Sequence, residues 1–305
     1  MGAYVKNNIT KLVGKTPLLA VPRLIRAFGC KADIYVKLEG ANPGGSVKDR
    51  AAVYMIQNAL ERRVIGKDTT VIAATGGSSA ISLAMVCAAY RLDCVIVMPD
   101  DTPSARVNAV KMYGAKVFAT PASGGIDATK QAAEALRVKL GNGYVFDFFE
   151  SEDAVDCHRE GTAIELLDAL GNIDILVAGV GTGATITGCG EVIKRNCPEC
   201  SVIAVEPAES AALSGGVIGM HGISGLGAGF IPPMLNTYLL NEVIRVRTAD
   251  AKELCRMIAK TEGIICGVSS GAALAAAVTV AQRPENAGKT LVCILPDRGD
   301  GSIIA

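Results

Sequence analysis

A single lysine stands at the start of a predicted helix, where the electrostatics favour chemistry over stability. Residues 42–50 read NPGGSVKDR, in which the proline and glycines predict a turn and Ser46 is a typical helix N-cap. Lys48 would lie in the first helical turn, where the positive end of the helix dipole disfavours an ammonium group. A lysine that forms a Schiff base benefits from a lowered pKa, because only a neutral amine attacks a carbonyl. The alternative is a solvated Lys48 that pairs with Asp49.

A second segment is suited to hold a phosphate group. A predicted strand over 173–178 runs into the loop 179–185, GVGTGAT, and then into a predicted helix over 186–195. Glycines let backbone N–H groups converge on an anion, and threonine hydroxyls add donors. The segment is not a Walker A loop, because no Gly-Lys-Ser/Thr follows. It also matches Gly-x-Gly-x-x-Ala, with Glu206 ending the next strand, so a nicotinamide-dependent dehydrogenase is an alternative.

Two further turns lead into predicted helices. Residues 75–80, TGGSSA, follow a predicted strand and offer bare amides and hydroxyls to a carboxylate or a phosphate. The alternative there is an ordinary turn in which Ser79 caps the helix. Residues 267–273, GVSSGAA, enter an alanine-rich helix, where a serine hydroxyl would cap the helix or reach a ligand ring.

The elements that must position these motifs alternate along the chain, which predicts βαβ units and parallel sheets covered by helices. We expect strands over residues 34–38, 70–74, 94–98, 116–119, 173–178, 201–205, 243–246 and 291–295. Helices are expected over residues 46–62, 79–90, 104–112, 126–140 and 186–195. The polar motifs fall where strands end and helices begin, the edge at which open parallel sheets collect ligands. A glycine-rich stretch, 214–233, is typical of a long functional loop.

The overall composition excludes several classes of partner. The 305 residues suit two domains or one large α/β unit, and half of them are apolar. Lys and Arg (30) balance Asp and Glu (30), so there is no basic field to attract nucleic acid or acidic lipid. The first residues lack the apolar run of a secretory signal, and no stretch reaches membrane-spanning length. We therefore expect a soluble, cytoplasmic protein that binds neither nucleic acid nor membrane.

The ten cysteines are scattered through predicted strands and helices, as small buried apolar residues would be. Cys197 and Cys200 have C-x-x-C spacing, but the chain has no second such pair and only two histidines. A surface turn before a strand is the preferred interpretation, with a zinc or redox site as the alternative. No metal site is predicted.

Taken together and in order, these segments resemble the cysteine synthase (O-acetylserine sulfhydrylase) and cystathionine β-synthase family of pyridoxal-phosphate enzymes. Residues 14–18, GKTPL, resemble the family's opening Gly-x-Thr-Pro-Leu, and residues 42–50 resemble its cofactor-lysine signature. Residues 205–207 (VEP), His221 and residues 225–232 (GLGAGFIP) resemble a stretch that is specific to this family. The resemblance implies the fold type II architecture, a two-domain α/β fold like that of the tryptophan synthase β-subunit.

This architecture predicts a smaller domain over residues 42–146, which carries the substrate loop. Residues 1–41 and 147–305 would form a larger, cofactor-binding domain. Lys48 would then lie near the domain boundary and the cofactor in the cleft between the domains, where ligand sites often lie. The family usually forms homodimers, so a homodimer is the assembly that the resemblance implies.

The resemblance also implies pyridoxal 5'-phosphate as the cofactor and a role for each matching residue. Lys48 would form the Schiff base with the cofactor and later move the α-proton of the substrate. Ser269 would meet the pyridine nitrogen, and a neutral hydroxyl there leaves the ring a weaker electron sink than a carboxylate partner would. That is consistent with loss of a β-substituent rather than with transamination. The cofactor phosphate would be held by Gly181, Thr182, Gly183, Ala184 and Thr185.

The substrate residues implied by the resemblance depart from the family pattern. The family's loop, Thr-Ser-Gly-Asn-Thr-Gly, becomes TGGSSA here, so Ser78 replaces the asparagine that contacts the cofactor ring hydroxyl and the substrate. Phe148, ten residues before His158, replaces a glutamine that reaches the substrate carboxylate. Residues 296–301, PDRGDG, depart from the family's Gly-Glu-Arg-Tyr. The substrate-binding residues so implied are Thr75, Gly76, Gly77, Ser78, Ser79, Phe148 and Gly225.

Three functions remain open on this basis. The first is cysteine synthase-like β-replacement, in which O-acetylserine and sulfide give cysteine and acetate through an aminoacrylate. The second is β-elimination or β-exchange on cysteine, serine, O-phosphoserine or homocysteine, forming hydrogen sulfide, lanthionine or cystathionine. The third is a catalytically silent scaffold or sensor that binds the cofactor. Some family members bind the C-terminal tail of serine acetyltransferase, which is therefore a candidate partner.

Overall fold

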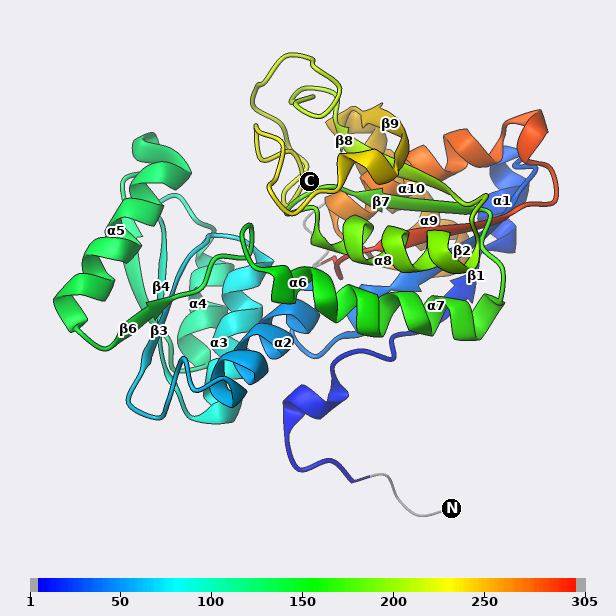
Figure 1. The fold of residues 1–305 in the computed structure, drawn as a ribbon. Helices are drawn as coiled ribbons and strands as arrows, with labels where there is room; N and C mark the ends of the chain where they lie inside the picture. Colours follow the sequence, from blue (N-terminus) through cyan, green and yellow to red (C-terminus); the bar gives the residue numbers. More distant parts are fainter. Residues whose placement is uncertain (1–4, 300–305) are drawn as a thin grey trace. The chain divides into compact units, whose positions relative to one another are not determined.

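The computed structural model describes residues 5–299 and divides them into two compact units (Figure 1). The smaller unit comprises residues 5–13 and 48–154, and the larger unit comprises residues 14–47 and 155–299. These limits differ from the predicted smaller domain of residues 42–146. Residues 42–47 belong to the larger unit because they hydrogen-bond there, as when the Val47 N–H donates to the Pro296 carbonyl at 2.7 Å. Asp153 extends the smaller unit because it accepts a hydrogen bond from Asn58 at 2.9 Å.

The smaller unit is built on a parallel sheet with the strand order β5-β4-β3-β6. Its strands are β3 (Thr70–Ala74), β4 (Asp93–Pro99), β5 (Lys116–Thr120) and β6 (Gly143–Val145). Its helices are α2 (Lys48–Glu61), α3 (Ser78–Tyr90), α4 (Ser104–Met112) and α5 (Gly125–Leu140), with 3-10 turns at Ile9–Leu12 and Ala122–Gly124. Because the strands run parallel, their carboxyl ends share one edge of the sheet.

The larger unit is built on a six-stranded sheet with the order β1-β2-β10-β7-β8-β9, in which only β1 runs antiparallel to its neighbour. Its strands are β1 (Leu18–Ala20), β2 (Asp33–Leu38), β7 (Ile175–Gly179), β8 (Ser201–Pro207), β9 (Leu240–Val246) and β10 (Thr290–Leu295). Its helices are α1 (Pro22–Phe28), α7 (Ala163–Leu170), α8 (Ala184–Asn196), α9 (Thr248–Glu262) and α10 (Val268–Ala281). Shorter turns lie at Glu39–Ala41, His158–Thr162, Thr237–Leu239 and Pro284–Asn286, and α6 (Glu152–Cys157) runs along the chain from one unit into the other.

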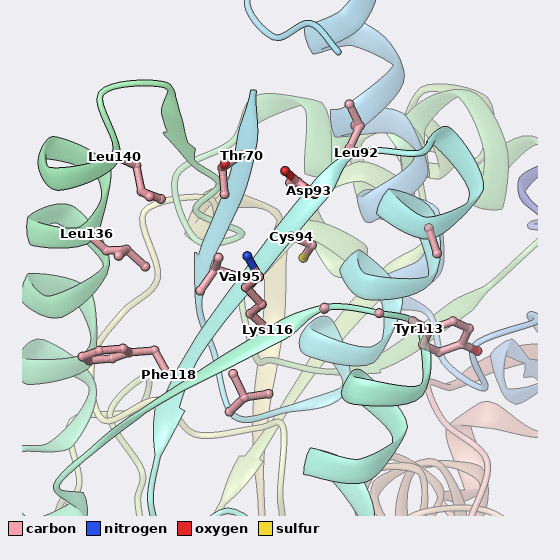
Figure 2. Close-up of a pocket in the computed structure, with 14 residues that line it drawn as sticks. Thr70, Leu92, Asp93, Cys94, Val95, Tyr113, Lys116, Phe118, Leu136 and Leu140 are labelled. Carbon is pink, nitrogen blue, oxygen red and sulfur yellow. The ribbon is translucent and has the colours of Figure 1, made fainter. Parts of the chain in front are cut away.

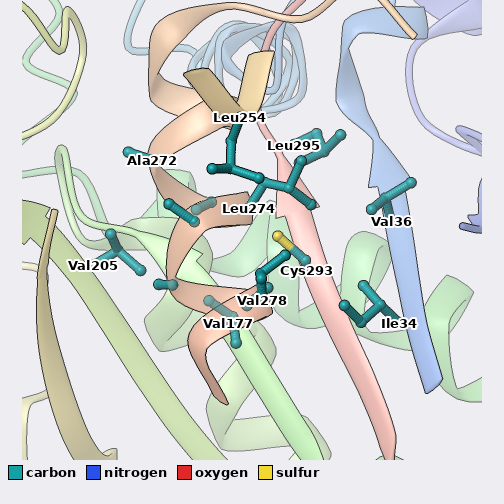
Figure 3. Packing of buried hydrophobic residues seen from close by; sticks show 14 of the residues in the cluster. Ile34, Val36, Val177, Val205, Leu254, Ala272, Leu274, Val278, Cys293 and Leu295 are labelled. Carbon is teal, nitrogen blue, oxygen red and sulfur yellow. The ribbon is translucent and has the colours of Figure 1, made fainter. Parts of the chain in front are cut away.

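Helices cover both faces of the larger sheet. Along β7, Val177 points into the cluster formed with α10, whereas Leu176 points into the cluster formed with α7 and α8. Figure 3 shows α10 against the sheet, where Leu274 and Val278 meet Val177 and Cys293. The alanines of α10 let its backbone approach the strands closely. This two-sided burial is the reason why the strands read as continuous apolar runs.

All eight predicted strands are present, with ends that shift by a few residues. Two short strands, β1 and β6, were not predicted. The helix predicted over residues 46–62 begins at Lys48. Ser46 is buried and pairs with Asp297 in an isolated antiparallel bridge. Within residues 5–299, no helix has the length and apolar character needed to cross a membrane.

Candidate active site

The carboxyl edge of the larger sheet brings two of the predicted cofactor elements together. Strands β7 and β10 are parallel neighbours, so the segments that follow them leave the sheet side by side. The segment after β7 is the glycine loop that opens α8, and the segment after β10 carries Asp297. Asp297 in turn hydrogen-bonds the first turn of α10, which contains Ser269. The topology therefore places the predicted phosphate loop and Ser269 at one edge.

The loop after β7 is packed so closely that a side chain at Gly181 or Gly183 would collide with its neighbours. A Cβ on Gly181 would lie 2.3 Å from the Gly225 carbonyl oxygen, and a Cβ on Gly183 would lie 2.8 Å from the Leu235 side chain. Gly183 is the N-cap of α8, has a φ of 85°, and has no side chain with which to cap the helix. Thr182 Oγ1 accepts a hydrogen bond from the Ala184 N–H at 3.4 Å. The start of α8 thus presents backbone N–H groups and hydroxyls, the donor set that a phosphate requires.

A buried histidine holds one hydroxyl of this loop. His158 is 2% exposed, and its Nε2 lies 3.2 Å from Thr185 Oγ1. Its Nδ1 lies 2.8 Å from Thr162 Oγ1, within a π-helical turn between α6 and α7. Sequence analysis used His158 only to locate Phe148 and missed this contact. The spacing of residues 158 and 162 on one helical turn was the available signal.

The N-terminus of α10 receives a carboxyl group from another element. Its N-cap is Gly267, which makes no side-chain cap, and a Cβ there would lie 2.1 Å from the Asp297 carboxyl. Ser270 Oγ donates to Asp297 Oδ1 at 2.6 Å. Burial raises the pKa of Asp297 above its ordinary value, and the hydrogen bond from Ser270 offsets this only in part. Sequence analysis noted residue 297 only as a departure from the family ending, of which residues 300 and 301 lie outside the described residues.

The carboxyl edge of the smaller sheet carries the predicted substrate loop. Thr75 follows β3, and its N–H donates to the Val97 carbonyl at 2.9 Å. The Gly77 N–H donates to Thr75 Oγ1 at 3.3 Å, and Gly77 is the N-cap of α3 with no side-chain cap. The helix begins at Ser78, so the alternative in which Ser79 caps it is wrong. Like α8, α3 leaves the amides of its first turn to an anion.

Two other residues, Phe148 and Arg106, belong to elements that neighbour this substrate loop. Phe148 follows β6, the neighbour of β3, and is 6% exposed. The Phe146 N–H donates to the Ile72 carbonyl at 2.8 Å, which keeps the chain alongside β3 as it leaves the sheet. Arg106, from α4, donates through Nη1 to the Gly76 carbonyl at 2.8 Å. Sequence analysis missed Arg106, since nothing in its local pattern separates it from a solvated helix residue.

Lys48 opens α2 and is half-buried. It directly follows Val47, whose N–H is bonded to the Pro296 carbonyl next to Asp297. Asp49 is fully buried and accepts a hydrogen bond from the Ser82 hydroxyl of α3 at 2.5 Å. Asp49 therefore packs α2 against α3 and does not lie in solvent.

The remaining predicted substrate residue, Gly225, lies in the larger unit. It belongs to the glycine-rich stretch, which packs on the loop after β7 because the Gly227 N–H donates to the Val180 carbonyl at 3.2 Å. His221 holds the same stretch. Its Nδ1 accepts from the Ile223 N–H at 3.2 Å, so its Nε2 donates to the Gly227 carbonyl at 3.1 Å.

Glu206 does not act as the acid of a dinucleotide site. It is 1% exposed, and its carboxylate accepts hydrogen bonds from the Leu213 N–H at 2.8 Å and from the N–H and hydroxyl of Ser214. These bonds use the carboxylate to close the turn that follows β8. A ribose hydroxyl would have to displace them, which argues against the dehydrogenase alternative.

The C-x-x-C pair spans a turn before β8, as predicted: the Cys200 N–H donates to the Cys197 carbonyl at 2.9 Å, and Pro198 and Glu199 between them are exposed. The two cysteines themselves pack into the core between α8 and β8. Cys197 and Cys200 are 7% and 2% exposed. Burial raises the pKa of the Cys200 thiol to about 12, which disfavours the thiolate needed for metal or redox chemistry. Between residues 5 and 299 there is no group of three or more His, Cys, Asp or Glu side chains that could hold a metal ion.

A pocket of about 340 Å³ lies elsewhere in the smaller unit. Thr70, Asp93 and Lys116, which line it, are the first residues of β3, β4 and β5, and Leu136 and Leu140 of α5 close one side (Figure 2). The pocket is therefore at the amino edge of the sheet, opposite to the substrate loop. None of the predicted site residues lines it.

Comparisons with known proteins agree with this arrangement. The pyridoxal-phosphate dependent enzyme family matches residues 9–297. A cysteine synthase from Staphylococcus aureus is 40% identical over 296 residues, which cover 96% of this chain and 94% of that protein. The crystal structure of a cysteine synthase from Entamoeba histolytica superposes with a TM-score of 0.93 at 34% identity, covering 97% of this chain and 88% of that one. A hydrogen sulfide-producing enzyme from Fusobacterium nucleatum gives a TM-score of 0.91 at 36% identity, covering 97% and 99%.

The resemblance, the fold type II architecture and the pyridoxal-phosphate cofactor expected from the motifs are confirmed by these matches. The match extends from η1 (Ile9–Leu12) to the segment after β10, so both units and both strand edges lie within it. The chain therefore belongs, over residues 9–297, to the family of pyridoxal-phosphate-dependent enzymes, and within that family it is similar to cysteine synthases.

Proposed function

We propose that this enzyme replaces the β-substituent of a small serine derivative with a sulfur nucleophile, as a cysteine synthase does. The observation that carries the proposal is a pair of helices, α3 and α8, that begin at strand ends with glycine N-caps and no capping side chain. Two other helices have glycine N-caps: α10 receives the Asp297 carboxyl, and α5 carries the carboxyl of Asp127 in its own first turn. The two helices without such a partner suit the two anions of the reaction, the cofactor phosphate and the substrate carboxylate.

The residues of the larger unit fit the cofactor. Gly181, Thr182, Gly183, Ala184 and Thr185 would hold its phosphate, with Thr185 oriented by His158. Ser269 would contact the pyridine nitrogen. Pyridoxal phosphate, when bound, supplies an electron sink conjugated to the α-carbon of an amino acid. We assign no carboxylate to direct contact with the ring, which favours departure of the β-substituent over transamination.

Lys48 would hold the cofactor through its side-chain amine and exchange a proton at the substrate α-carbon. Its place in the first turn of α2 serves both roles, because the helix dipole stabilises the neutral amine. Thr75, Gly76, Gly77 and Ser79 would bind the substrate carboxylate through the amides at the start of α3. Ser78 would face the cofactor ring hydroxyl and the substrate.

A second function is favoured by one observation. Phe148 is buried in the segment after β6, the neighbour of β3, at a position where the family has a carboxylate-binding glutamine, so the substrate contacts would differ from those of a standard cysteine synthase. A structural relative is a hydrogen sulfide-producing enzyme. The alternative is therefore β-elimination or β-exchange on cysteine, serine, O-phosphoserine or homocysteine. The catalytically silent scaffold is the third outcome of the same test.

The proposed function requires an amino acid and sulfide or a thiol as small-molecule partners. A homodimer, the C-terminal tail of serine acetyltransferase as a binding partner, and a cytoplasmic location are further proposals that rest on the resemblance and on the composition.

The test is a titration of the cofactor-loaded protein with O-acetylserine, followed by its visible absorption, with sulfide added last. The proposal expects a change of absorption that sulfide reverses while cysteine appears. Release of sulfide from cysteine, without a response to O-acetylserine, would support the second function. Bound cofactor with no response to O-acetylserine, cysteine, serine, O-phosphoserine or homocysteine would contradict both and leave the silent scaffold.

A further inference from the structure

The pocket at the amino edge of the smaller sheet lies apart from every residue assigned to the reaction. Its volume of about 340 Å³ falls within the range of about 300–1,000 Å³ that small-molecule sites occupy. It is lined by the first residues of β3, β4 and β5, whereas the substrate loop follows the last residue of β3. A molecule bound in the pocket would therefore occupy a site of its own.

The strand register places charged and apolar lining residues on one face of this sheet. Lys116 of β5 is the register partner of Val95 of β4. Side chains two residues apart on a strand share a face, so Asp93 lies on the face of Val95, and Phe118 lies on the face of Lys116. Val95 packs in one cluster with Leu136 of α5, which identifies this face as the one that α5 covers.

The apolar part of the lining is open to solvent. The helix α5 packs chiefly on β3, β4 and β6, and it leaves the edge strand β5 less covered. Phe118, at the centre of β5, is 50% exposed, and Leu140, at the end of α5, is 42% exposed. Figure 2 shows Leu136 and Leu140 on α5 facing the strands that carry Val95 and Lys116. Exposed apolar side chains that surround a hollow are typical of a binding site.

Two opposite charges accompany this apolar surface. Asp93 and Lys116 are both exposed, and neither forms an ion pair or a side-chain hydrogen bond with another residue between 5 and 299. A strand spacing of about 4.8 Å and a rise of about 3.3 Å per residue place their Cα atoms about 8 Å apart. A purely anionic ligand would be repelled by Asp93, and a purely cationic ligand would be repelled by Lys116. The complement to both is a molecule that carries an ammonium and a carboxylate group close together.

We propose that this pocket is a second amino-acid site, which takes a free α-amino acid with a large apolar side chain. The ammonium group of the ligand lies at Asp93 and its carboxylate at Lys116. Its side chain lies against Phe118, Leu136 and Leu140. The inference does not depend on the proposed reaction, because the lining contains none of the residues assigned to the cofactor or to the substrate.

The competing explanation is that a second copy of the chain covers these apolar side chains. The strand β5 is at the edge of its sheet, and an edge strand can pair with another chain. The two explanations differ in what Leu140 does. In an amino-acid site, Leu140→Gln weakens ligand binding and leaves the oligomeric state unchanged. In an interface between copies, the same substitution changes the oligomeric state.

The experiment titrates L-phenylalanine into the cofactor-loaded protein by isothermal titration calorimetry. The visible absorption of the cofactor is recorded alongside, because a probe that binds at the cofactor alters it. The analogue 3-phenylpropionate lacks the ammonium group, and phenethylamine lacks the carboxylate, so each tests one charge. Asp93→Asn and Lys116→Gln remove the two charges of the pocket. Asp68→Asn and Lys139→Gln are the matched controls, at exposed positions of the same unit that do not line the pocket.

We expect saturable binding with a dissociation constant on the order of 0.1–1 mM, as for a ligand of about a dozen non-hydrogen atoms. Asp93→Asn and Lys116→Gln should each weaken binding roughly 10-fold, the equivalent of one charge-assisted hydrogen bond, and both controls should bind as wild type. The two analogues should also bind roughly 10-fold more weakly, for the same reason. In methyl NMR spectra, L-phenylalanine should shift the signals of Val95 and Leu136 while the visible absorption stays unchanged.

The proposal is overturned if wild type shows no saturable binding below about 10 mM, or if both charge variants bind as tightly as wild type. Equal affinity for 3-phenylpropionate would mean a site for carboxylates in general, and a change in visible absorption would place the probe at the cofactor. Either result contradicts the proposal, as does a changed oligomeric state of Leu140→Gln in size-exclusion chromatography. None of these measurements needs turnover, so a failure of the proposed β-replacement would leave them unaffected.

Discussion

The two strand edges that carry the predicted site residues share one backbone arrangement but differ in how their side chains are buried and bonded. Each has a glycine-capped helix that begins where a parallel strand ends. At the larger unit's edge, Thr182 and Ser269 are buried. His158 hydrogen-bonds the Thr185 hydroxyl, and Asp297 accepts a hydrogen bond from the Ser270 hydroxyl. At the smaller unit's edge, the residues from Thr75 to Ser78 are all half-exposed, and the guanidinium of Arg106 grips a backbone carbonyl rather than a side chain.

This difference separates what the two edges can change. A loop whose side chains are fixed by buried partners tolerates few substitutions, because each one leaves a polar group without its partner. A loop that offers mainly backbone amides keeps its anion site while its side chains vary. The larger unit therefore retains the cofactor pattern of the family, and the smaller unit is where the substrate pattern has changed. The predictions below test whether cofactor and substrate functions divide in this way.

The largest effect is expected from Lys48→Ala. Loss of the amine that moves the α-proton should lower turnover by roughly 10²- to 10⁴-fold, the usual contribution of a positioned acid–base group. Borohydride reduction followed by peptide mass spectrometry should find the cofactor attached to Lys48 in wild type. Lys67→Ala, at an exposed position of the same unit, is the control and should behave as wild type. Attachment at any other lysine would contradict the assignment.

The next largest effect is expected from Gly181→Ala, on cofactor binding and stability together. The new Cβ would lie 2.3 Å from the Gly225 carbonyl oxygen, so loop and glycine-rich stretch must separate at a cost of about 1–3 kcal/mol. Urea unfolding and the dissociation constant of pyridoxal phosphate measure the two effects. Gly190→Ala, in α8 itself, is the control. Its nearest contacts are 3.5 Å away, and it should be neutral or stabilising by up to about 1 kcal/mol.

The motifs were enough to predict the main parallel strands and the residues of the phosphate loop, because both depend on local sequence. Apolar runs identify strands buried on both faces, and a glycine loop before a helix identifies an anion site. The short strands β1 and β6 were not predicted, because a strand of three residues is too short to show a hydrophobic periodicity.

The partners that complete the site come from distant parts of the chain, so the sequence alone could not identify them. Asp297 meets α10 only because β10 ends beside the start of that helix. Ser46 was predicted from its type and position to cap the helix, and the local pattern gave no sign of its bridge to Asp297. Arg106 reaches Gly76 from a separate helix. In each case the contact is tertiary and leaves no local signal.

An intermediate effect is expected from Phe148→Gln combined with Ser78→Asn, which restores the family's substrate residues. If the smaller unit alone sets the substrate, KM for O-acetylserine should fall about 10-fold, corresponding to one charge-assisted hydrogen bond of about 1.5 kcal/mol. The cofactor absorption should stay the same. Tyr144→Gln, on β6, is the control and should leave KM unchanged. An unchanged KM in the double variant would place Phe148 outside the substrate site.

A smaller effect is expected from Arg106→Ala. Removing the hydrogen bond from Arg106 Nη1 to the Gly76 carbonyl, 2.8 Å long, frees the substrate loop at a cost of about 1 kcal/mol. KM for the amino acid should rise roughly five-fold with little change in kcat, since that energy corresponds to such a factor. Lys111→Ala, at an exposed position of α4, should have no effect. A loss of kcat alone would mean that Arg106 acts on chemistry rather than on binding.

The smallest effect is expected from an ion pair that belongs to neither edge. Arg283 bonds Glu242 of β9 through both nitrogens, at 2.7 and 2.8 Å, and lowers the pKa of that carboxyl from its ordinary 4.5. Because the pKa of Glu242 is lower in the folded protein than in the unfolded chain, the ion pair stabilises the fold fully at pH values above the unfolded-state pKa. This stabilisation is lost as the pH falls through the folded-state pKa. The pair is partly exposed, so its contribution should stay below about 1 kcal/mol.

Urea unfolding of wild type and Arg283→Gln at about pH 6 and about pH 3 tests this pair, because the two pH values lie on either side of the expected change. The variant should be less stable at the higher pH, and the gap should close at the lower pH. Arg137→Gln, which removes the more exposed partner of Glu134 in the smaller unit, should show a smaller gap. A gap that persists after acidification would mean that Arg283 stabilises through packing rather than through its charge.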